Sequence, residues 1–227
     1  MSRPAITVHH LENSRSQRVL WLLEELGVRY EVVRHLRDPK TKLAPPALRA
    51  IHPLGHAPLV VTGDEVLAES GAIVETLVER HDTAGDFAPV PGTPARQHYR
   101  YWMHFAEGSA MPPLVMGLVF ARIRSAPMPF FARPIARSIA DRAMAGFAGP
   151  QVAANRAHMD EHLARHPWFA GDTFSAADVQ MSFPVEATAA RAGLDGRPAL
   201  AAWLAKIHAR PAYARALERG GPYMLLR

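Results

Sequence analysis

The sequence predicts a small α/β domain with a mixed sheet, followed by an all-α domain. Three observations support this prediction. Strand and helix patterns follow the order β-α-β-α-β-β-α over residues 1–83, a stretch rich in Gly, Pro and Ala spans 84–94, and residues 95–227 contain no good strand pattern. The expected division is therefore a first domain at 1–83, a linker at 84–94 and a helical domain at 95–227.

The first β-α-β unit comes from residues 5–36. Residues 5–11 are short and β-prone, and residues 28–36 return to strand character. Between them, apolar residues recur on one helical face: Val19, Leu22, Leu23 and Leu26. Gly27 then provides a typical helix end. Because the crossover contains a helix, the two strands are expected to be parallel.

The rest of the first domain adds a hairpin and a third helix. The proline-rich stretch before it leaves room for one short helix near 47–50. Two apolar runs flank Thr62-Gly63-Asp64, which predicts antiparallel strands joined by a tight turn. The next helix, within 70–81, has one apolar face formed by Ile73, Val74, Leu77 and Val78.

The second domain is predicted to be entirely helical. A long helix after residue 95 is interrupted at Pro112-Pro113, where a kink or break is expected. Ser175 and Asp178 have the spacing of a capping box, which predicts that a helix begins there. Further helices are expected within 133–166 and near 199–209 and 212–219.

Composition indicates a globular protein, since 48% of its 227 residues are hydrophobic and 21% are charged. The chain contains no apolar run of about 18 residues and no secretory signal pattern, so we expect a cytoplasmic protein that does not bind a membrane. The formal charge of +5 is spread among acidic residues without basic blocks. We therefore expect no nucleic-acid partner, and a mildly positive surface suits small acidic ligands.

Histidine and cysteine usage limits the chemistry. His158, His162 and His166 are spaced one helical turn apart, which can chelate a metal, but no acidic residues converge on them. We interpret these histidines as a solvated face and expect no metal site. The chain has no cysteine, which excludes disulfides and a thiol nucleophile of its own.

Five stretches in order resemble cytosolic glutathione transferases, and the first looks most like serine-type members from bacteria and fungi: "NSRSQRVLWLLEELG", "IHPLGHAPLV", "ESGAIVETL", "FSAADVQMSF" and "RPAYARALERGGPY". The resemblance covers nearly the whole chain. It implies a thioredoxin-like first domain, a homodimer, and glutathione as co-substrate without a metal or prosthetic group. It also implies transfer of glutathione to a small hydrophobic electrophile.

Ser14 and Ser16 are the candidate catalytic residues. A serine ahead of a helix is most often only its cap. At a helix N-terminus, however, a hydroxyl also helps to stabilise a bound thiolate, because the dipole and unpaired N–H groups favour negative charge. Ser14 lies four residues before Arg18, where the serine-type family has its catalytic hydroxyl. We therefore favour Ser14 over Ser16.

The resemblance assigns the remaining glutathione contacts. It implies a cis bond between Ala57 and Pro58, with the Ala57 backbone pairing with the cysteinyl part of glutathione. His56 stands where many relatives have Lys and is expected near the glycyl carboxylate. Glu69 and Ser70 are expected to bind the γ-glutamyl ammonium and carboxylate. Residues assigned by position to the second-substrate pocket are Tyr101, Phe105 and Met111, with Met116 and Tyr223 as further candidates.

Two alternative functions stay open at this point. One is a glutathione-dependent peroxidase or reductase that uses the same thiolate. The other is a non-catalytic protein that binds glutathione or a partner on the same scaffold.

Overall fold

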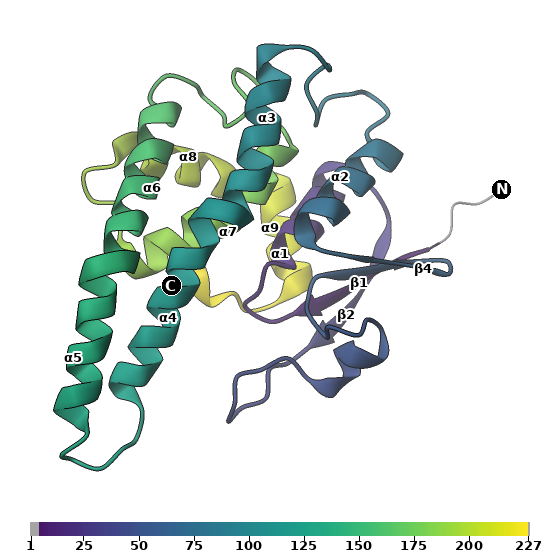
Figure 1. The fold of residues 1–227 in the computed structure, drawn as a ribbon. Helices are drawn as coiled ribbons and strands as arrows, with labels where there is room; N and C mark the ends of the chain where they lie inside the picture. The colour runs from purple at the N-terminus through teal and green to yellow at the C-terminus, as the bar shows by residue number, and fades with distance from the viewer. Residues whose placement is uncertain (1–4, 227) are drawn as a thin grey trace.

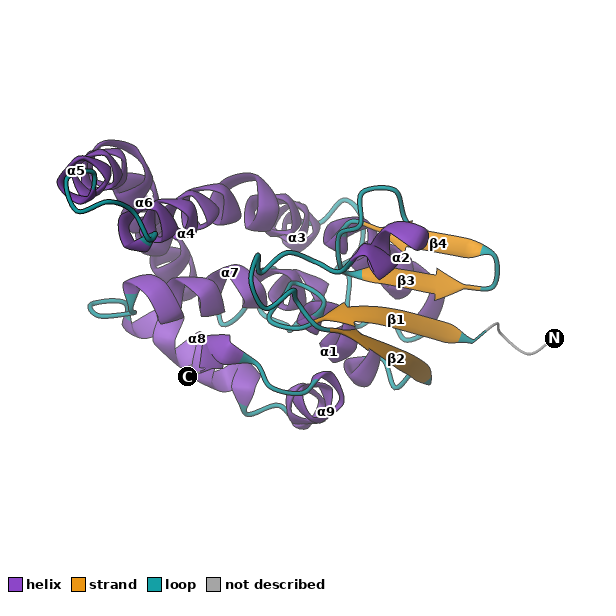
Figure 2. Ribbon diagram, turned by 90° about the horizontal axis from the view of Figure 1, so that it is seen from below, coloured by secondary structure: helices purple, strands orange, loops and turns teal. Residues whose placement is uncertain are grey.

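A computed structural model describes residues 5–226. Its four-stranded sheet contains β1 (Ile6–Leu11), β2 (Tyr30–His35), β3 (Leu59–Thr62) and β4 (Glu65–Ala68) in the order β2-β1-β3-β4 (Figure 2). β1 and β2 are parallel, whereas β1 pairs antiparallel with β3 and β3 pairs antiparallel with β4. The predicted mixed sheet is therefore confirmed, including the direction of each pair.

Two helices and one short helical turn complete the α/β part. α1 (Gln17–Glu25) is the crossover between β1 and β2, and α2 (Ser70–His81) follows β4 (Figure 1). The short helix predicted at 47–50 is a 3₁₀ helix, Pro46–Ala50, begun by a proline. The predicted apolar faces of α1 and α2 are buried in the core.

Helices make up the second part of the chain. They are α3 (Pro94–Phe105), α4 (Met111–Ser125), α5 (Arg133–Ala143), α6 (Gly149–Leu163), α7 (Ala176–Ala192), α8 (Pro198–His208), α9 (Pro211–Gly220) and a final 3₁₀ turn, Met224–Leu226. None of the helices in the described part of the chain is long and apolar enough to cross a membrane.

The break predicted at Pro112-Pro113 takes the form of a π-helical turn, Ala106–Ala110, between α3 and α4. The two prolines then lie in the first turn of α4, where a missing N–H costs least. The wide turn adds a residue to the helical repeat. As a result, residues after 110 face a different direction from the one that the α3 pattern alone predicts.

α9 packs on α1 and holds the two parts together (Figure 1). Arg210 forms an ion pair with Glu25, and Arg215 and Arg219 both reach Glu24. Arg34 on β2 donates hydrogen bonds to backbone carbonyls at the end of α9. The carboxyl-terminal helix is therefore anchored to the elements on which the candidate site is built.

The interpretation of His162 as part of a solvated face was wrong. Its side chain is only 8% exposed, and its ring centroid lies 4.8 Å from that of Trp102. Its Nε2 lies 3.0 Å from the carbonyl oxygen of Phe169. The periodicity predicted a helix, but only packing against α3 shows which face of α6 is covered. Among the described residues, no group of three histidine or acidic side chains is placed to hold a metal ion.

Acid is expected to weaken the fold through His162. Burial, together with the charge of His166, lowers its pKa from an ordinary value of 6.5 to about 4. Between those values the unfolded chain binds the proton and the folded chain does not. The free energy of unfolding should therefore fall by up to about 3 kcal/mol as pH drops from 6.5 to 4.

Urea titrations between pH 4 and 7 measure this effect in the wild type and in His162→Gln, whose amide still donates to Phe169. The variant should show a shallower loss of stability in acid. His104→Gln, a change of an exposed histidine on α3, is the matched control and should retain the wild-type slope. If the free energy of unfolding falls equally steeply with decreasing pH in His162→Gln and in the wild type, His162 is not the source of the acid sensitivity.

Candidate functional site

The loop between β1 and α1 presents one serine to a cavity of about 570 Å³. Asn13 turns the chain with φ 50°, and its Oδ1 accepts a hydrogen bond from the Met224 backbone N–H at 2.7 Å. Ser14 follows and lines the cavity, although it is only 6% exposed. Its Oγ lies 2.7 Å from Ser16 Oγ and accepts a hydrogen bond from the Ser16 N–H. The Ser14 hydroxyl is therefore held in place at the amino end of α1.

Ser16 lies behind Ser14 and does not line the cavity. It is fully buried at the start of α1. Its Oγ lies 2.9 Å from Nδ1 of His10, a residue of β1 whose pKa burial lowers to about 4. The uncharged ring therefore accepts a hydrogen bond from the Ser16 hydroxyl when its proton is on Nε2. Of the two candidate serines, only Ser14 can touch a ligand in the cavity.

The other predicted glutathione contacts line the same cavity. They come from the segment before β3 and from the junction of β4 and α2: His56, Ala57, Pro58, Glu69 and Ser70. The bond between Ala57 and Pro58 is cis. Glu69 has φ 68°, a left-handed conformation that is uncommon for a residue with a side chain. This conformation leaves the Glu69 side chain exposed while Ser70 begins α2 as a buried residue.

An ion-pair network built around one buried arginine supports Ser70 from behind. Arg18 is fully buried on α1, donates to Ser70 Oγ at 3.1 Å and pairs with Glu107 in the π-helical turn. Arg15 Nε contacts the same carboxylate at 2.9 Å. Burial opposes ionisation of Glu107, but Arg18 and Arg15 outweigh it and lower the pKa of that carboxyl. The network joins both parts of the protein at the wall of the cavity.

Sequence reasoning missed this network. The available signal was a charged residue, Arg18, within the apolar face of α1. Such a residue needs a buried partner. Nothing in the sequence identified Glu107 as that partner, because it lies 89 residues away along the chain.

The helical part supplies an apolar wall to the cavity. Met111, Val115 and Leu118 come from α4 at a helical spacing, and Phe183 comes from α7. Met111 was among the residues predicted for a second-substrate pocket, and the structure brings it to the cavity that Ser14 lines.

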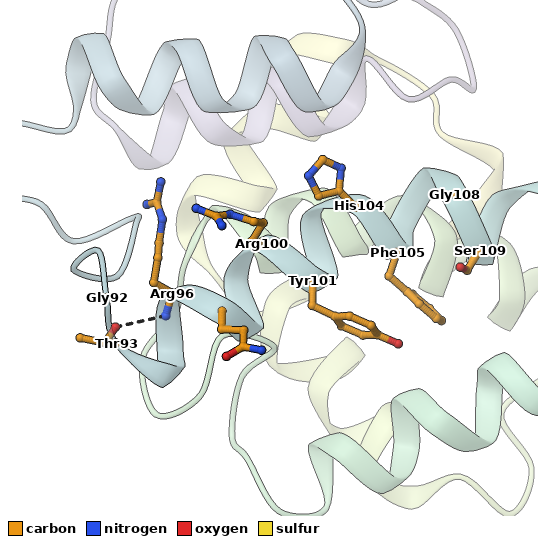
Figure 3. Close-up of a pocket in the computed structure, with 10 residues that line it drawn as sticks. Gly92, Thr93, Arg96, Arg100, Tyr101, His104, Phe105, Gly108 and Ser109 are labelled. Carbon is orange, nitrogen blue, oxygen red and sulfur yellow. Dashed lines mark hydrogen bonds between the residues drawn. The ribbon is translucent and has the colours of Figure 1, made fainter.

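Tyr101 and Phe105 do not reach this cavity, which corrects their predicted placement. They line a separate groove along α3, and Figure 3 shows them on a different side of that helix from Arg96, Arg100 and His104. Tyr101 stacks on Phe105 and its hydroxyl lies 2.9 Å from His158 of α6. The π-helical turn explains the error, since it separates the direction of α3 from that of α4.

The two further candidates are also absent from the cavity wall. Met116 does not line it, and Tyr223 is buried with its hydroxyl donating to Glu186 at 2.7 Å. The cavity thus has a polar half formed by the sheet side and an apolar half formed by α4 and α7. Such a cavity can bind two ligands side by side, a polar one in the polar half and a hydrophobic one in the apolar half.

Comparisons with known proteins agree with this geometry. The family model described as "Glutathione S-transferase, N-terminal domain" matches residues 8–85, and "Glutathione S-transferase, C-terminal domain" matches residues 130–211. Glutathione S-transferase 1 of Saccharomyces cerevisiae is 32% identical over 96% of this chain and 97% of its own. Glutathione S-transferase 3 of Schizosaccharomyces pombe is 37% identical over 94% of this chain and 87% of its own.

Solved structures show the same architecture. A glutathione S-transferase from Actinobacillus pleuropneumoniae superposes with a TM-score of 0.80 at 32% identity, covering 98% of this chain and 96% of its own. A glutathione transferase from Phanerochaete chrysosporium, solved with oxidized glutathione, shares the fold with a TM-score of 0.74 at 21% identity, covering 96% and 95%.

Proposed function

Because the chain belongs to the glutathione S-transferase family, we propose that it joins the sulfur of glutathione to an electrophilic carbon. The thiol first loses its proton to solvent. The thiolate then forms the S–C bond while the leaving group departs with its electron pair. The observation that carries this proposal is the Ser14 hydroxyl, held at the amino end of α1 on the wall of the shared cavity.

The proposed role of Ser14 is to donate a hydrogen bond to the sulfur. A free thiol has a pKa of about 8.5, and a donor at a helix N-terminus favours the thiolate over the thiol. Ser16 and His10 lie behind it and hold this loop through the contacts of Ser16 with Ser14 and His10. With the Ser16 proton donated to His10, the Ser14 hydroxyl turns its own proton from Ser16 Oγ to the sulfur when glutathione binds. The polypeptide has no thiol, so the reacting sulfur belongs to the substrate.

The rest of glutathione is proposed to lie along the sheet side of the cavity. Ser70 accepts a hydrogen bond from the buried Arg18, which leaves its hydroxyl proton and N–H free to face the γ-glutamyl carboxylate. The Glu69 carboxylate faces the neighbouring ammonium. The Ala57 backbone pairs with the cysteinyl unit, and His56 lies at the glycyl end.

Glu69→Gln is expected to raise KM for glutathione about tenfold with little change in kcat. The variant loses an ion pair that is made equally in the ground state and the transition state. Initial rates measured against glutathione concentration test this expectation. Glu79→Gln, an exposed carboxylate later in α2, is the control and should leave KM unchanged. A lower kcat at unchanged KM would contradict the assignment.

Conjugation of glutathione to 1-chloro-2,4-dinitrobenzene tests the function itself. We expect turnover well above the uncatalysed rate, and calorimetry should detect glutathione binding in the absence of the arene. Failure to bind glutathione at millimolar concentration would overturn the proposal.

We also propose that the protein works as a homodimer and that its second substrate is largely hydrophobic. The apolar wall formed by α4 and α7 supports the hydrophobic substrate. The open groove along α3, with Tyr101 47% exposed at its side, supports a protein contact there. Light scattering should give twice the chain mass of 24.9 kDa.

A further inference from the structure

Positive charge gathers at the apolar half of the cavity. Arg15, Arg37 and Arg191 all line it. Arg122 of α4 lies close enough to influence Arg37 and Arg191 electrostatically. The four guanidinium groups come from four separate segments of the chain, namely the loop before α1, the segment after β2, α4 and α7.

Two of the four are compensated by nearby carboxylates. Arg15 forms its ion pair with Glu107. Glu12 accepts a hydrogen bond from the Arg37 backbone N–H at 2.8 Å, and its charge favours the protonated form of that side chain.

The other two have no carboxylate partner. Within residues 5–226, neither Arg122 nor Arg191 forms an ion pair, and Arg191 Nη1 donates only a long hydrogen bond, 3.4 Å, to the Leu114 carbonyl. Burial lowers the pKa of Arg191, and the charges of Arg122 and Arg15 lower it further. Like charges held together without acids are unfavourable unless an anion occupies the site between them.

Glutathione does not need Arg191 for its own carboxylates. The γ-glutamyl end is assigned to Glu69 and Ser70 and the glycyl end to His56, all on the sheet side. Arg191 instead comes from α7 and lines the apolar wall of the cavity together with Leu118 and Phe183. The uncompensated cation therefore stands beside the apolar surface on which the second substrate rests.

We propose that the second substrate is an apolar electrophile that also carries an anionic group, such as a carboxylate, and that Arg191 binds this group. The inference rests on the proposed transferase function and adds a substrate class to it. Arg122 strengthens the binding through its positive charge. The anionic group does not react: the thiolate forms the S–C bond elsewhere on the electrophile, and the leaving group takes the electron pair.

A matched pair of substrates tests the inference. The probes are 4-chloro-3,5-dinitrobenzoate and its neutral analogue 4-chloro-3,5-dinitrobenzamide, with each kcat/KM divided by the uncatalysed rate with glutathione. We expect the wild type to favour the benzoate about tenfold after this correction, as for a charge-assisted hydrogen bond. Arg191→Gln should remove most of that preference and leave turnover of the benzamide unchanged.

Arg124→Gln is the matched control, because Arg124 lies on α4 but pairs with Asp141 at 3.3 Å. It should retain the preference, and Arg191→Lys should restore part of it. No preference in the wild type, or an equal loss for both substrates in Arg191→Gln, would overturn the inference.

Binding separates this inference from the transferase proposal. The ready-made glutathione conjugates of the two arenes can be titrated by tryptophan fluorescence whether or not the enzyme turns over. If neither arene reacts, the transferase proposal fails, while tighter binding of the benzoate conjugate, lost in Arg191→Gln, still supports the anion site. Equal affinity for the two conjugates would reject that site.

Discussion

Ser14→Ala is expected to lower kcat/KM for conjugation about 100-fold, because it removes the one hydroxyl that lines the cavity at the amino end of α1. The loss should lie in formation of the thiolate. The pKa of enzyme-bound glutathione should therefore rise by one unit or more, toward that of a free thiol. Ultraviolet absorbance of the bound thiolate, followed across pH, measures this shift directly.

Two further variants make the Ser14 result specific. Ser14→Thr retains a hydroxyl and should recover much of the activity. Ser109→Ala removes an exposed serine from the α3 groove and should have no effect. If the thiol of bound glutathione titrates alike in Ser14→Ala and the wild type, Ser14 is not the activating group.

Asp178→Ala is expected to reduce the free energy of unfolding by about 4 kcal/mol, because it leaves several buried donors without an acceptor. Asp178 is fully buried at the start of α7 and accepts hydrogen bonds from the backbone N–H groups of Phe169 and Ser175 and from Trp203 Nε1. One carboxylate thus joins the loop before α7 to α8. Urea denaturation of the purified protein measures the loss.

The role of Asp178 is structural, so activity per folded molecule should not change. Asp178→Asn retains one acceptor oxygen and should be less damaging than Asp178→Ala. Asp172→Ala, at an exposed position of the same loop, should leave stability near the wild-type value. A large fall in kcat for folded Asp178→Asn would indicate a catalytic role instead.

Local patterns predicted the fold well because each one is set by neighbouring residues. The helix between β1 and β2 required a parallel pair, and the tight turn at Gly63 required an antiparallel one. The capping box of Ser175 and Asp178 is likewise a relation between residues three positions apart. None of these inferences needed information about distant parts of the chain.

The errors arose where tertiary packing decides the outcome. Tyr101 and Phe105 lie before a π-helical turn that the sequence patterns did not predict. Their side chains face the groove along α3 instead of the cavity. The spacing of His162 from the other histidines of its helix was interpreted as a solvent-exposed face, but its ring packs against Trp102. The arginines at the cavity are far apart along the chain, so their accumulation could be seen only after folding.

The contact between Asn13 and Met224 has a consequence for synthesis on the ribosome. The two residues are 211 positions apart, so the loop before α1 is translated well before Met224. At about 5–20 residues per second, its final hydrogen-bond partner emerges roughly 10–40 seconds later. A nascent chain therefore cannot complete the hydrogen bonds of the loop before α1 until Met224 has been made.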